Sequence, residues 1–140
     1  MVKIKVETNH IYGYQSIRKH YDSDLGYDLV CPKNITLKKG KFVKIPLGIK
    51  IKLPKGYGAF IKDRSSMASK GIHVLGGVID NDYIGELQVI LINFGKKYKI
   101  KRGDKIAQLV LIKTVDCNVE FVYELESTKR GDKGFGSSGR

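Results

Sequence analysis

The sequence has few of the residues on which much enzyme chemistry depends, since its 140 residues include only two cysteines and three histidines. Cys31 and Cys117 lie far apart and have no partner at metal-ligand spacing, which favours a reduced, intracellular protein. The histidines are scattered at His10, His20 and His73, and there is no HExxH sequence and no Walker-type loop. The sequence therefore offers no metal cluster, no P-loop and no nucleophile–base pair.

Long apolar runs are also missing. The first ten residues alternate charged and apolar side chains and lack the apolar stretch of a signal peptide. No segment approaches the roughly 20 apolar residues that span a bilayer. We therefore expect a soluble, intracellular protein, in the cytoplasm or nucleus of its source or host. The length suits one domain with its own core.

The net charge of +12 is the unusual bulk property of this sequence. Such a charge suits nucleic acid, an anionic surface or a pocket that gathers polyphosphate. The lysines recur as singles and pairs, however, and alternating lysines in a strand-rich chain usually form the solvated face. No stacking series of aromatic residues accompanies them, so we expect any nucleic-acid binding to be weak, non-specific and strongly salt-dependent.

Hydrophobic periodicity predicts β-strands. The segment from Phe42 to Leu53 alternates apolar and polar residues, as half-buried strands do. Glu86 to Phe94 contains a continuous apolar run that suits a strand buried on both faces. Lys105 to Lys113 and Asn118 to Leu125 are also expected to be strands, and a short helix is expected from near Ser66 to Gly71. Short strands separated by glycine turns predict an all-β barrel or jelly roll.

The last residues, Lys129 to Arg140, differ in composition from the rest. They include four glycines, two serines, several charges and a single aromatic residue, Phe135. Such a segment cannot bury enough apolar surface to fold by itself. A frayed tail is one interpretation, and a flap that closes over a ligand is the other.

Three glycine-flanked polar clusters are the candidate binding elements. Arg64-Ser65-Ser66-Met67-Ala68 opens the short helix and suits phosphate, although an N-cap beside a surface arginine explains it as well. Gly76 to Glu86 lets the backbone approach a planar ligand, or it is a hairpin with a polar turn. Within it, Asp80 and Tyr83 offer a base and a flat surface. Gly103 to Leu109 reads as a turn leading into a strand.

Taken in order, these clusters resemble the five motifs of the homotrimeric dUTPase family, over Gly26 to Arg140. The matching segments are Gly26-Tyr27-Asp28-Leu29, Arg64 to Ala68 with Lys70-Gly71, Gly77 to Glu86, Gly103 to Leu109, and Arg130-Gly131 followed by Gly134 to Gly139. The resemblance implies hydrolysis of dUTP to dUMP and pyrophosphate with Mg²⁺, which limits uracil incorporation into DNA and supplies dUMP for thymidylate synthesis.

The resemblance also implies an architecture. The fold would be a distorted jelly-roll β-barrel with one short helix, a barrel domain over residues 1–128 and a flexible C-terminal lid over residues 129–140. Three chains would form a homotrimer whose active sites are shared between chains.

By the same resemblance, Asp80 would orient and deprotonate the water that attacks the α-phosphate. Tyr83 would lie under the deoxyribose and leave no room for a 2′-hydroxyl group. Asp28 would reach Mg²⁺ through a metal-bound water, while the triphosphate holds most of the ion's coordination. The remaining residues that would bind substrate are Gly77, Val78 and Ile79 for uracil, Arg64, Ser65, Ser66 and Gln108 for the phosphates, and Arg130, Phe135, Gly136 and Ser137 from the lid. Within this group, Phe135 would stack on uracil and Arg130 would grip the γ-phosphate.

Two other functions are compatible with the same fold. A dCTP deaminase shares the arginine-serine-serine phosphate site but carries a catalytic glutamate where this chain has Ile90, which cannot activate water. A nucleotide-dependent regulatory binding protein is the second alternative, with a protein partner that the sequence does not identify. Asp80 and the tail are both present, which favours an enzyme over a binding protein that has lost its activity.

Overall fold

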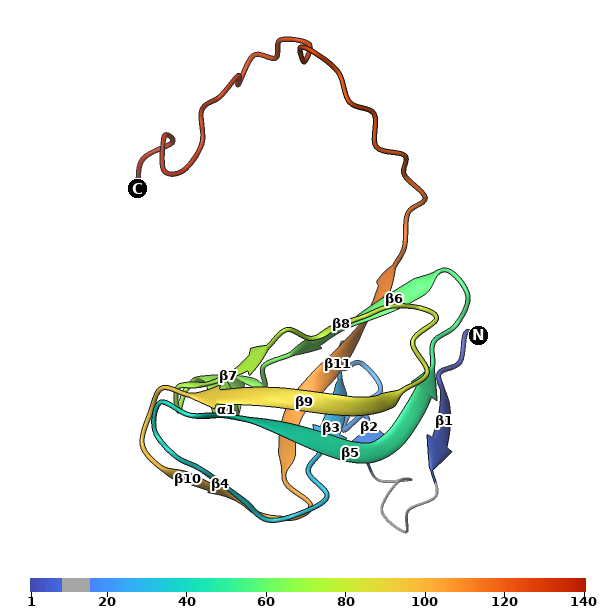
Figure 1. The fold of residues 1–140 in the computed structure, drawn as a ribbon, viewed down its shortest axis with the longest axis vertical. Coiled ribbons are helices and arrows are strands. Elements are labelled where there is room, and N and C mark those ends of the chain that lie inside the picture. The colour runs from blue at the N-terminus through green and yellow to red at the C-terminus, as the bar shows by residue number, and fades with distance from the viewer. Residues whose placement is uncertain (9–15) are drawn as a thin grey trace.

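The computed structural model describes residues 1–8 and 16–140 and consists of antiparallel strands with one helical turn (Figure 1). Residues 9–15, which include His10, lie outside the described residues. The elements are β1 (Lys5–Thr8), β2 (Ile17–Arg18), β3 (Tyr27–Val30), β4 (Ile35–Leu37), β5 (Phe42–Lys52), β6 (Tyr57–Lys62), α1 (Ser65–Ala68), β7 (Ile72–Leu75), β8 (Val78–Ile79), β9 (Glu86–Asn93), β10 (Tyr98–Ile100) and β11 (Lys105–Lys113).

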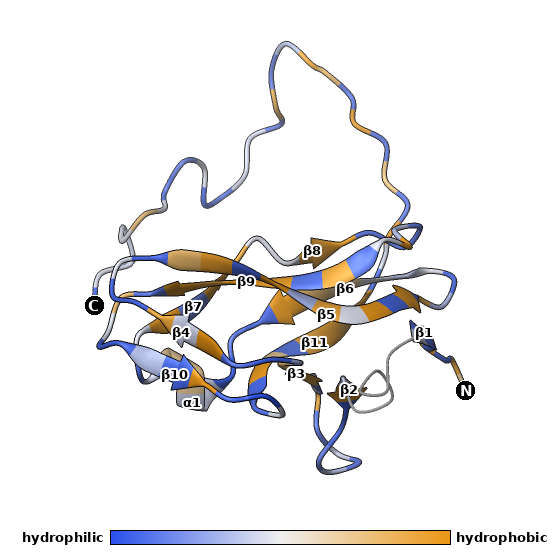
Figure 2. Cartoon of the chain, turned by 60° about the horizontal axis from the view of Figure 1, so that its bottom comes forward, coloured by the Kyte–Doolittle hydropathy of each residue, from blue (hydrophilic) through white to orange (hydrophobic). Residues whose placement is uncertain are grey.

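The strands form two larger sheets around one apolar core. One sheet has the order β1-β5-β9-β7 and the other has the order β2-β3-β11-β6-β8, while β10 and β4 form a separate pair. Both larger sheets contribute buried aliphatic side chains to the same cluster. Figure 2 shows apolar segments alternating with polar ones along these strands. The sheets do not close on one another, so the fold is the distorted all-β jelly roll that the sequence predicts.

The long strand β5 shows why the alternating pattern predicted the fold well. Its inward residues Ile45, Leu47, Ile49 and Ile51 are almost completely buried. The lysines of the strand, Lys44, Lys50 and Lys52, are exposed at the alternate positions. Because side chains of a strand alternate between its two faces, the sequence places one apolar row on the core.

The structure corrects two sequence predictions, the burial of β9 and the length of α1. In β9, Leu87, Val89 and Leu91 are buried but Ile90 and Ile92 are only half-buried, so the strand is not buried on both faces. The helix α1 is also shorter than predicted, since it ends at Ala68.

The segment from Asn118 to Leu125 forms no strand, contrary to the prediction. After β11 the chain continues as an arm (residues 114–128) and then a tail (residues 129–140), and both stand clear of the barrel (Figure 1). The alternation in the arm is real, but no neighbouring strand of the same chain pairs with it. A boundary between barrel and lid near residue 128 stays a prediction.

None of the helical structure in the described part of the chain has the length and apolarity that crossing a membrane requires.

Candidate functional site

The first candidate pocket lies beside the segment from Gly77 to Glu86, which turns from β8 into β9 and is called the hairpin below. Its two strands belong to different sheets, since β8 pairs with β6 and β9 pairs with β5 and β7. Its volume is about 230 Å³, and the hairpin contributes Gly77, Val78, Ile79, Asp80 and Tyr83 to its wall. Strands β6, β7 and β9 supply most of the remaining wall, which is largely apolar. Five of the predicted site residues therefore line one pocket, with the carboxylate of Asp80 exposed to solvent.

Gly77 is required at its position by both its dihedral angle and its surroundings. Its φ of +96° lies in the region that residues with a Cβ rarely adopt. A Cβ at this position would lie 2.6 Å from the carbonyl oxygen of Ile61. The same two residues are joined by a hydrogen bond, because the Ile61 N–H donates to the Gly77 carbonyl at 2.7 Å. The glycine thus lets β8 begin directly against β6, which forms the inner wall of the pocket.

Tyr83 is held by hydrogen bonds from its hydroxyl and from its backbone N–H. Its hydroxyl donates to the carbonyl of Glu86 at 2.8 Å, and its backbone N–H donates to the carbonyl of Asp80 at 3.2 Å. A Cβ at position 85 would lie 2.6 Å from the ring carbon that bears the hydroxyl, so Gly85 leaves space for the ring. Asn81 anchors the whole hairpin, since its side-chain amide donates to the carbonyls of Pro54 and Tyr57.

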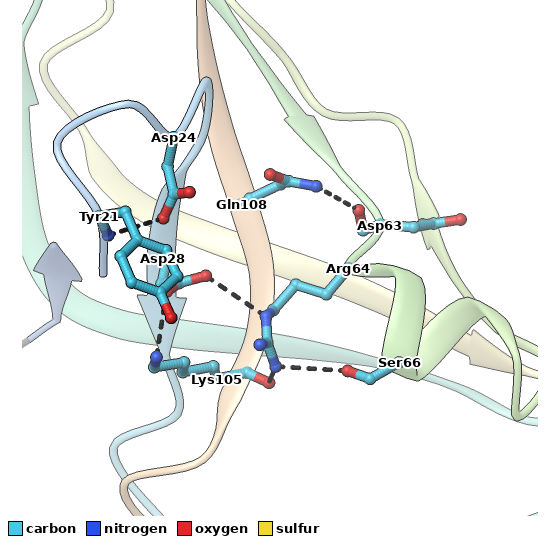
Figure 3. Close-up of polar contacts among 8 residues, drawn as sticks. All are labelled: Tyr21, Asp24, Asp28, Asp63, Arg64, Ser66, Lys105 and Gln108. Carbon is cyan, nitrogen blue, oxygen red and sulfur yellow. Dashed lines mark hydrogen bonds and ion pairs between the residues drawn. The ribbon is translucent and has the colours of Figure 1, made fainter. Parts of the chain in front are cut away.

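The second candidate pocket lies between β3, β11 and the start of α1, and has a volume of about 450 Å³. Figure 3 shows its central cluster, in which Asp28 pairs with two cations. Its carboxylate oxygens lie 3.3 Å from Arg64 Nε and 3.3 Å from Lys105 Nζ. Arg64 also donates to the carbonyl of Lys105 at 3.1 Å, and its Nη1 lies 3.4 Å from Ser66 Oγ. The cluster itself has two cations to one carboxylate, which suits an anionic ligand, and Asp24 adds a second carboxylate elsewhere in the pocket wall.

Gln108 completes the second pocket from β11. Its amide nitrogen donates to the carbonyl of Asp63 at 2.8 Å (Figure 3). A Cβ at position 26 would collide with the amide group of Gln108, so Gly26 in the first predicted motif makes room for Gln108 in the fourth. Ser65 also lines this pocket, which confirms that the clusters around Asp28, Arg64 and Gln108 meet.

Lys105 is one of the residues of this pocket that the sequence analysis did not assign to it, with His20, Tyr21, Asp24 and Leu25. In a regular strand, residues three apart lie on opposite faces, so Lys105 and Gln108 would not share a pocket. The pairing of β11 with β3 shifts between Lys105 and Ala107, and Ile106 and Ala107 are both buried. This β-bulge brings Lys105 and Gln108 to the same side of the strand.

Asp63 was also missed by the sequence analysis. Its carboxylate accepts from the N–H of Val74 at 2.6 Å and lies 2.7 Å from Nδ1 of His73. Since its carbonyl accepts from Gln108, Asp63 connects the end of β6 to both β7 and β11. The one sequence feature that could have indicated Asp63 is its position immediately before Arg64, the first residue of the Arg64 to Ala68 cluster.

The two pockets share no lining residue. Arg130, Phe135, Gly136 and Ser137 are exposed and line neither pocket, and the tail to which they belong stands clear of the barrel (Figure 1). Within the tail, Arg130 Nε donates to the carbonyl of Lys133 at 2.8 Å. A single chain therefore does not bring Asp80, Arg64 and Phe135 into one site.

The acidic and sulfur-containing side chains limit what metal or nucleophile chemistry is available. In residues 1–8 and 16–140, no group of three His, Cys, Asp or Glu side chains is arranged to hold a metal ion. Asp28, whose side chain is 15% exposed, is the carboxylate of the cationic pocket closest to Arg64 and Lys105. One such carboxylate suits a magnesium ion that arrives with substrate phosphates, not a site built wholly from protein ligands. Burial raises the pKa of the Cys31 thiol, which disfavours the nucleophilic thiolate.

Comparison with known sequences gives one consistent result. The chain matches the dUTPase family model over residues 14–139. It is 47% identical to the deoxyuridine 5′-triphosphate nucleotidohydrolase of Clostridium novyi, with 99% of each chain covered. It is 46% identical to the protein of the same name from Paramecium bursaria Chlorella virus 1, with 81% of this chain and 82% of the relative covered. It is also 42% identical, over 84% of its length, to the Pol polyprotein of caprine arthritis encephalitis virus, of which it spans 11%.

Solved structures show the same fold. The dUTPase of Staphylococcus bacteriophage 80alpha with dUPNHPP is similar with a TM-score of 0.89 and 25% identity, and 99% of each chain is covered. The EIAV dUTPase is similar with a TM-score of 0.76 and 30% identity, covering 89% of this chain and 100% of that one.

Proposed function

The chain belongs to the dUTPase family, and from this premise we propose that it hydrolyses dUTP to dUMP and pyrophosphate. One observation carries the proposal: the chain has two pockets of different chemistry. The hairpin pocket offers backbone groups, Tyr83 and Asp80, and the other pocket offers cations that suit phosphates. The first matches the needs of a base, a sugar and an attacking water, and the second those of a triphosphate. The reaction would limit uracil incorporation into DNA and supply dUMP for thymidylate synthesis, inside the cell where these nucleotides are used.

The hairpin pocket accounts for selection of the base and sugar. The backbone of Gly77, Val78 and Ile79 offers N–H and C=O groups to the polar edge of uracil, and the close packing against β6 leaves little room for a methyl group at carbon 5. Cytosine presents mismatched donors and acceptors to the same backbone. Tyr83, fixed by its hydrogen bond to Glu86, lies under the deoxyribose and excludes a 2′-hydroxyl group.

The cationic pocket binds the phosphate chain. Arg64 exchanges part of its contact with Asp28 for phosphate oxygens, and Ser65, Ser66 and Gln108 add hydrogen bonds. Lys105 supplies the second positive charge. Asp28 is the residue that would hold Mg²⁺, through a water, and the bound ion would supply positive charge to the phosphates.

Asp80 serves as the general base. Its carboxylate takes a proton from a water as the water oxygen forms a bond to the α-phosphorus, and the bond from that phosphorus to the bridging oxygen of pyrophosphate breaks. No covalent intermediate is needed in this step, so the reaction requires no activated thiol. The positive charge around Arg64 stabilises the charge that develops on the phosphates.

We further propose that the complete site forms between chains of a homotrimer. A nucleotide needs both pockets at once, yet no lining residue is common to them in one chain. The arm supports association as well, because its apolar residues lie at alternate positions and are exposed; Phe121, for example, is 95% exposed. Half-buried Ile90 on the outer face of β9 adds a second apolar surface.

The tail acts as the lid of this shared site. Phe135 stacks on uracil and Arg130 binds the γ-phosphate. Gly136 and Ser137 also contact the substrate. All four are exposed in the isolated chain, which agrees with a segment that becomes ordered only on the substrate of another chain.

The alternative activity as a dCTP deaminase is not supported by the pocket. Ile90, at the position where that enzyme carries its glutamate, lines the hairpin pocket and offers no group to activate water. A regulatory role with a protein partner stays a prediction that the sequence analysis raised.

The experiment that tests the proposal is pyrophosphate release from dUTP, dCTP, dTTP and UTP, each with magnesium and at equal concentration. We expect release from dUTP alone. A folded protein that releases no pyrophosphate from any of the four would contradict the proposal, and ammonia released from dCTP would favour the deaminase.

A further inference from the structure

The basic residues are concentrated in two segments that contain no acidic residue. Residues 29–62 contain nine lysines and residues 87–103 contain five lysines and arginines, with no aspartate or glutamate in either. More than half of the 26 basic residues thus lie in these two acid-free segments. Their positive charge is not offset locally unless the fold brings carboxylates to them.

The fold instead brings the two acid-free segments together at one end of the barrel. Tyr98 pairs with Leu37, and Phe42 pairs with Ile92, so the β4–β5 turn lies beside the β9–β10 turn (Figure 1). We call this region the lysine end, defined by the exposed residues Lys38, Lys39, Lys41, Lys96, Lys97 and Lys99. None of the three ion pairs found among the described residues includes a lysine of this end.

Buried Asn93 fixes the two turns to one another. Its side-chain amide donates to the carbonyls of Leu37 at 3.0 Å and Lys96 at 2.8 Å, and its side-chain oxygen accepts from the N–H of Gly95 at 2.9 Å. Its backbone exchanges two further hydrogen bonds with Gly40 and Lys41. The backbone that carries the lysines is therefore held in place by hydrogen bonds before any ligand binds, so binding need not order the two turns.

Two exposed phenylalanines lie among these lysines. Phe42 is 62% exposed and Phe94 is 64% exposed. Phe42 faces the same side of the sheet as Ile92, its partner on β9, and Phe94 follows two residues later. The sequence gives no sign that both phenylalanines lie at this end, since they are far apart in the chain.

We propose that the lysine end binds single-stranded nucleic acid, a function separate from hydrolysis of dUTP. Lysines bind the phosphate backbone, and exposed aromatic rings stack on unpaired bases, as in proteins that bind single strands without sequence preference. Exposed rings favour a single strand over a duplex, whose bases are already stacked. The proposal uses none of the residues assigned to either nucleotide pocket, so it does not depend on the proposed activity.

The test is fluorescence anisotropy of a labelled oligothymidylate titrated with the full-length protein. For about three phosphate contacts we expect the logarithm of the association constant to fall with that of the salt concentration with a slope of about −2. The variant Phe42→Ala/Phe94→Ala should bind about tenfold or more weakly, with little change in this slope. The variant Lys39→Gln/Lys96→Gln/Lys97→Gln should bind more weakly and with a shallower slope.

A matched control removes the same charge elsewhere. Lys52 ends β5 at the opposite end from Phe42, and Lys113 pairs with Tyr57 next to the turn that contains Lys55. The variant Lys52→Gln/Lys55→Gln/Lys113→Gln should keep most of the affinity, and all variants should still hydrolyse dUTP if the parent protein does. Duplex of the same length should bind more weakly than the single strand.

Three results would overturn the proposal. Equal loss in the test and control lysine variants would mean that only net charge matters. Displacement of the oligonucleotide by a non-hydrolysable dUTP analogue would place it in the nucleotide site. A change in molecular mass on substitution of Phe42 and Phe94, measured by light scattering, would show that this end is a contact between copies of the chain.

Discussion

At the scale of single residues, Asp80 and Asp82 are exposed carboxylates two positions apart on one hairpin, but Asp80 lines the nucleotide pocket and Asp82 does not. We expect Asp80→Asn to reduce turnover of dUTP by about 10²- to 10⁴-fold, because the water loses its base. Binding of a non-hydrolysable analogue, measured by calorimetry, should persist. Asp82→Asn is the matched control and should keep its activity. Substantial turnover by Asp80→Asn would place the base elsewhere.

Tyr83 combines a ring that faces the pocket with a hydroxyl that bonds to Glu86. Two substitutions separate these contributions. Tyr83→Ala removes the ring, and we expect the ratio of kcat/KM for dUTP over UTP to fall by about tenfold or more, since the space for a 2′-hydroxyl opens. Tyr83→Phe loses the hydrogen bond but keeps the ring, so most of the selectivity should remain. Equal selectivity in all three proteins would exclude the sugar-selecting role.

The residue scale also shows where sequence reasoning was sufficient. Asp80, Tyr83 and Gly77 are close in sequence, and one hairpin brings them to one pocket. Lys105 was not identified, because its place beside Gln108 depends on a β-bulge. Such a bulge is a feature of strand pairing and leaves only a weak trace in local composition.

At the scale of elements, β8 depends on Gly77 for its start. Gly77→Ala would combine a positive φ with a close approach of Cβ to the Ile61 carbonyl. We expect a loss of about 2 kcal/mol or more in the free energy of unfolding, measured by urea denaturation. Gly40→Ala is the control, since its φ is also positive but no atom lies within 4 Å of the added Cβ. A smaller loss for Gly77→Ala than for Gly40→Ala would contradict the packing argument.

The tail offers a test of an element without folded contacts to the barrel. Removal of residues 129–140 should leave thermal unfolding and assembly size unchanged, because these residues are exposed. Activity toward dUTP should be severely reduced, since Phe135 and Arg130 are lost. A truncated protein with normal kcat and KM would show that the tail is not a lid.

Elements with their own partners in the chain were predictable, and those without were not. Alternation predicted β5, and the strand forms because both of its neighbours, β1 and β9, belong to the same chain. The arm has the same alternation over residues 115–125 but forms no strand here. Periodicity shows that a segment has one apolar face, but it does not show which surface covers that face.

At the scale of the whole molecule, the arm differs from the barrel in charge. Residues 114–128 contain four acidic and no basic residues, whereas residues 1–113 contain 22 basic and nine acidic ones. An acidic arm with exposed apolar side chains thus complements the basic barrel of another copy, and electrostatic attraction should assist association. We expect Phe121→Ser/Tyr123→Ser to shift the assembly toward smaller species in sedimentation, with activity falling in parallel. Lost activity with an intact assembly would instead indicate a local effect of the arm.

The strongest test of a shared site uses two inactive variants together. Asp80→Asn damages the hairpin pocket and Arg64→Ala damages the phosphate pocket, and each alone should be inactive. If one chain supplies the hairpin and another supplies the phosphate pocket, trimers formed after unfolding and refolding of an equal mixture will contain intact sites. An intact site needs the Arg64→Ala variant as the chain that supplies the hairpin and the Asp80→Asn variant as the chain that supplies the phosphate pocket. Each has a chance of one half in random assembly, so about a quarter of the parental activity should return. If each site belonged to one chain, every site would carry one of the two lesions and the mixture would stay inactive. Refolding each variant alone is the control, and it should restore nothing.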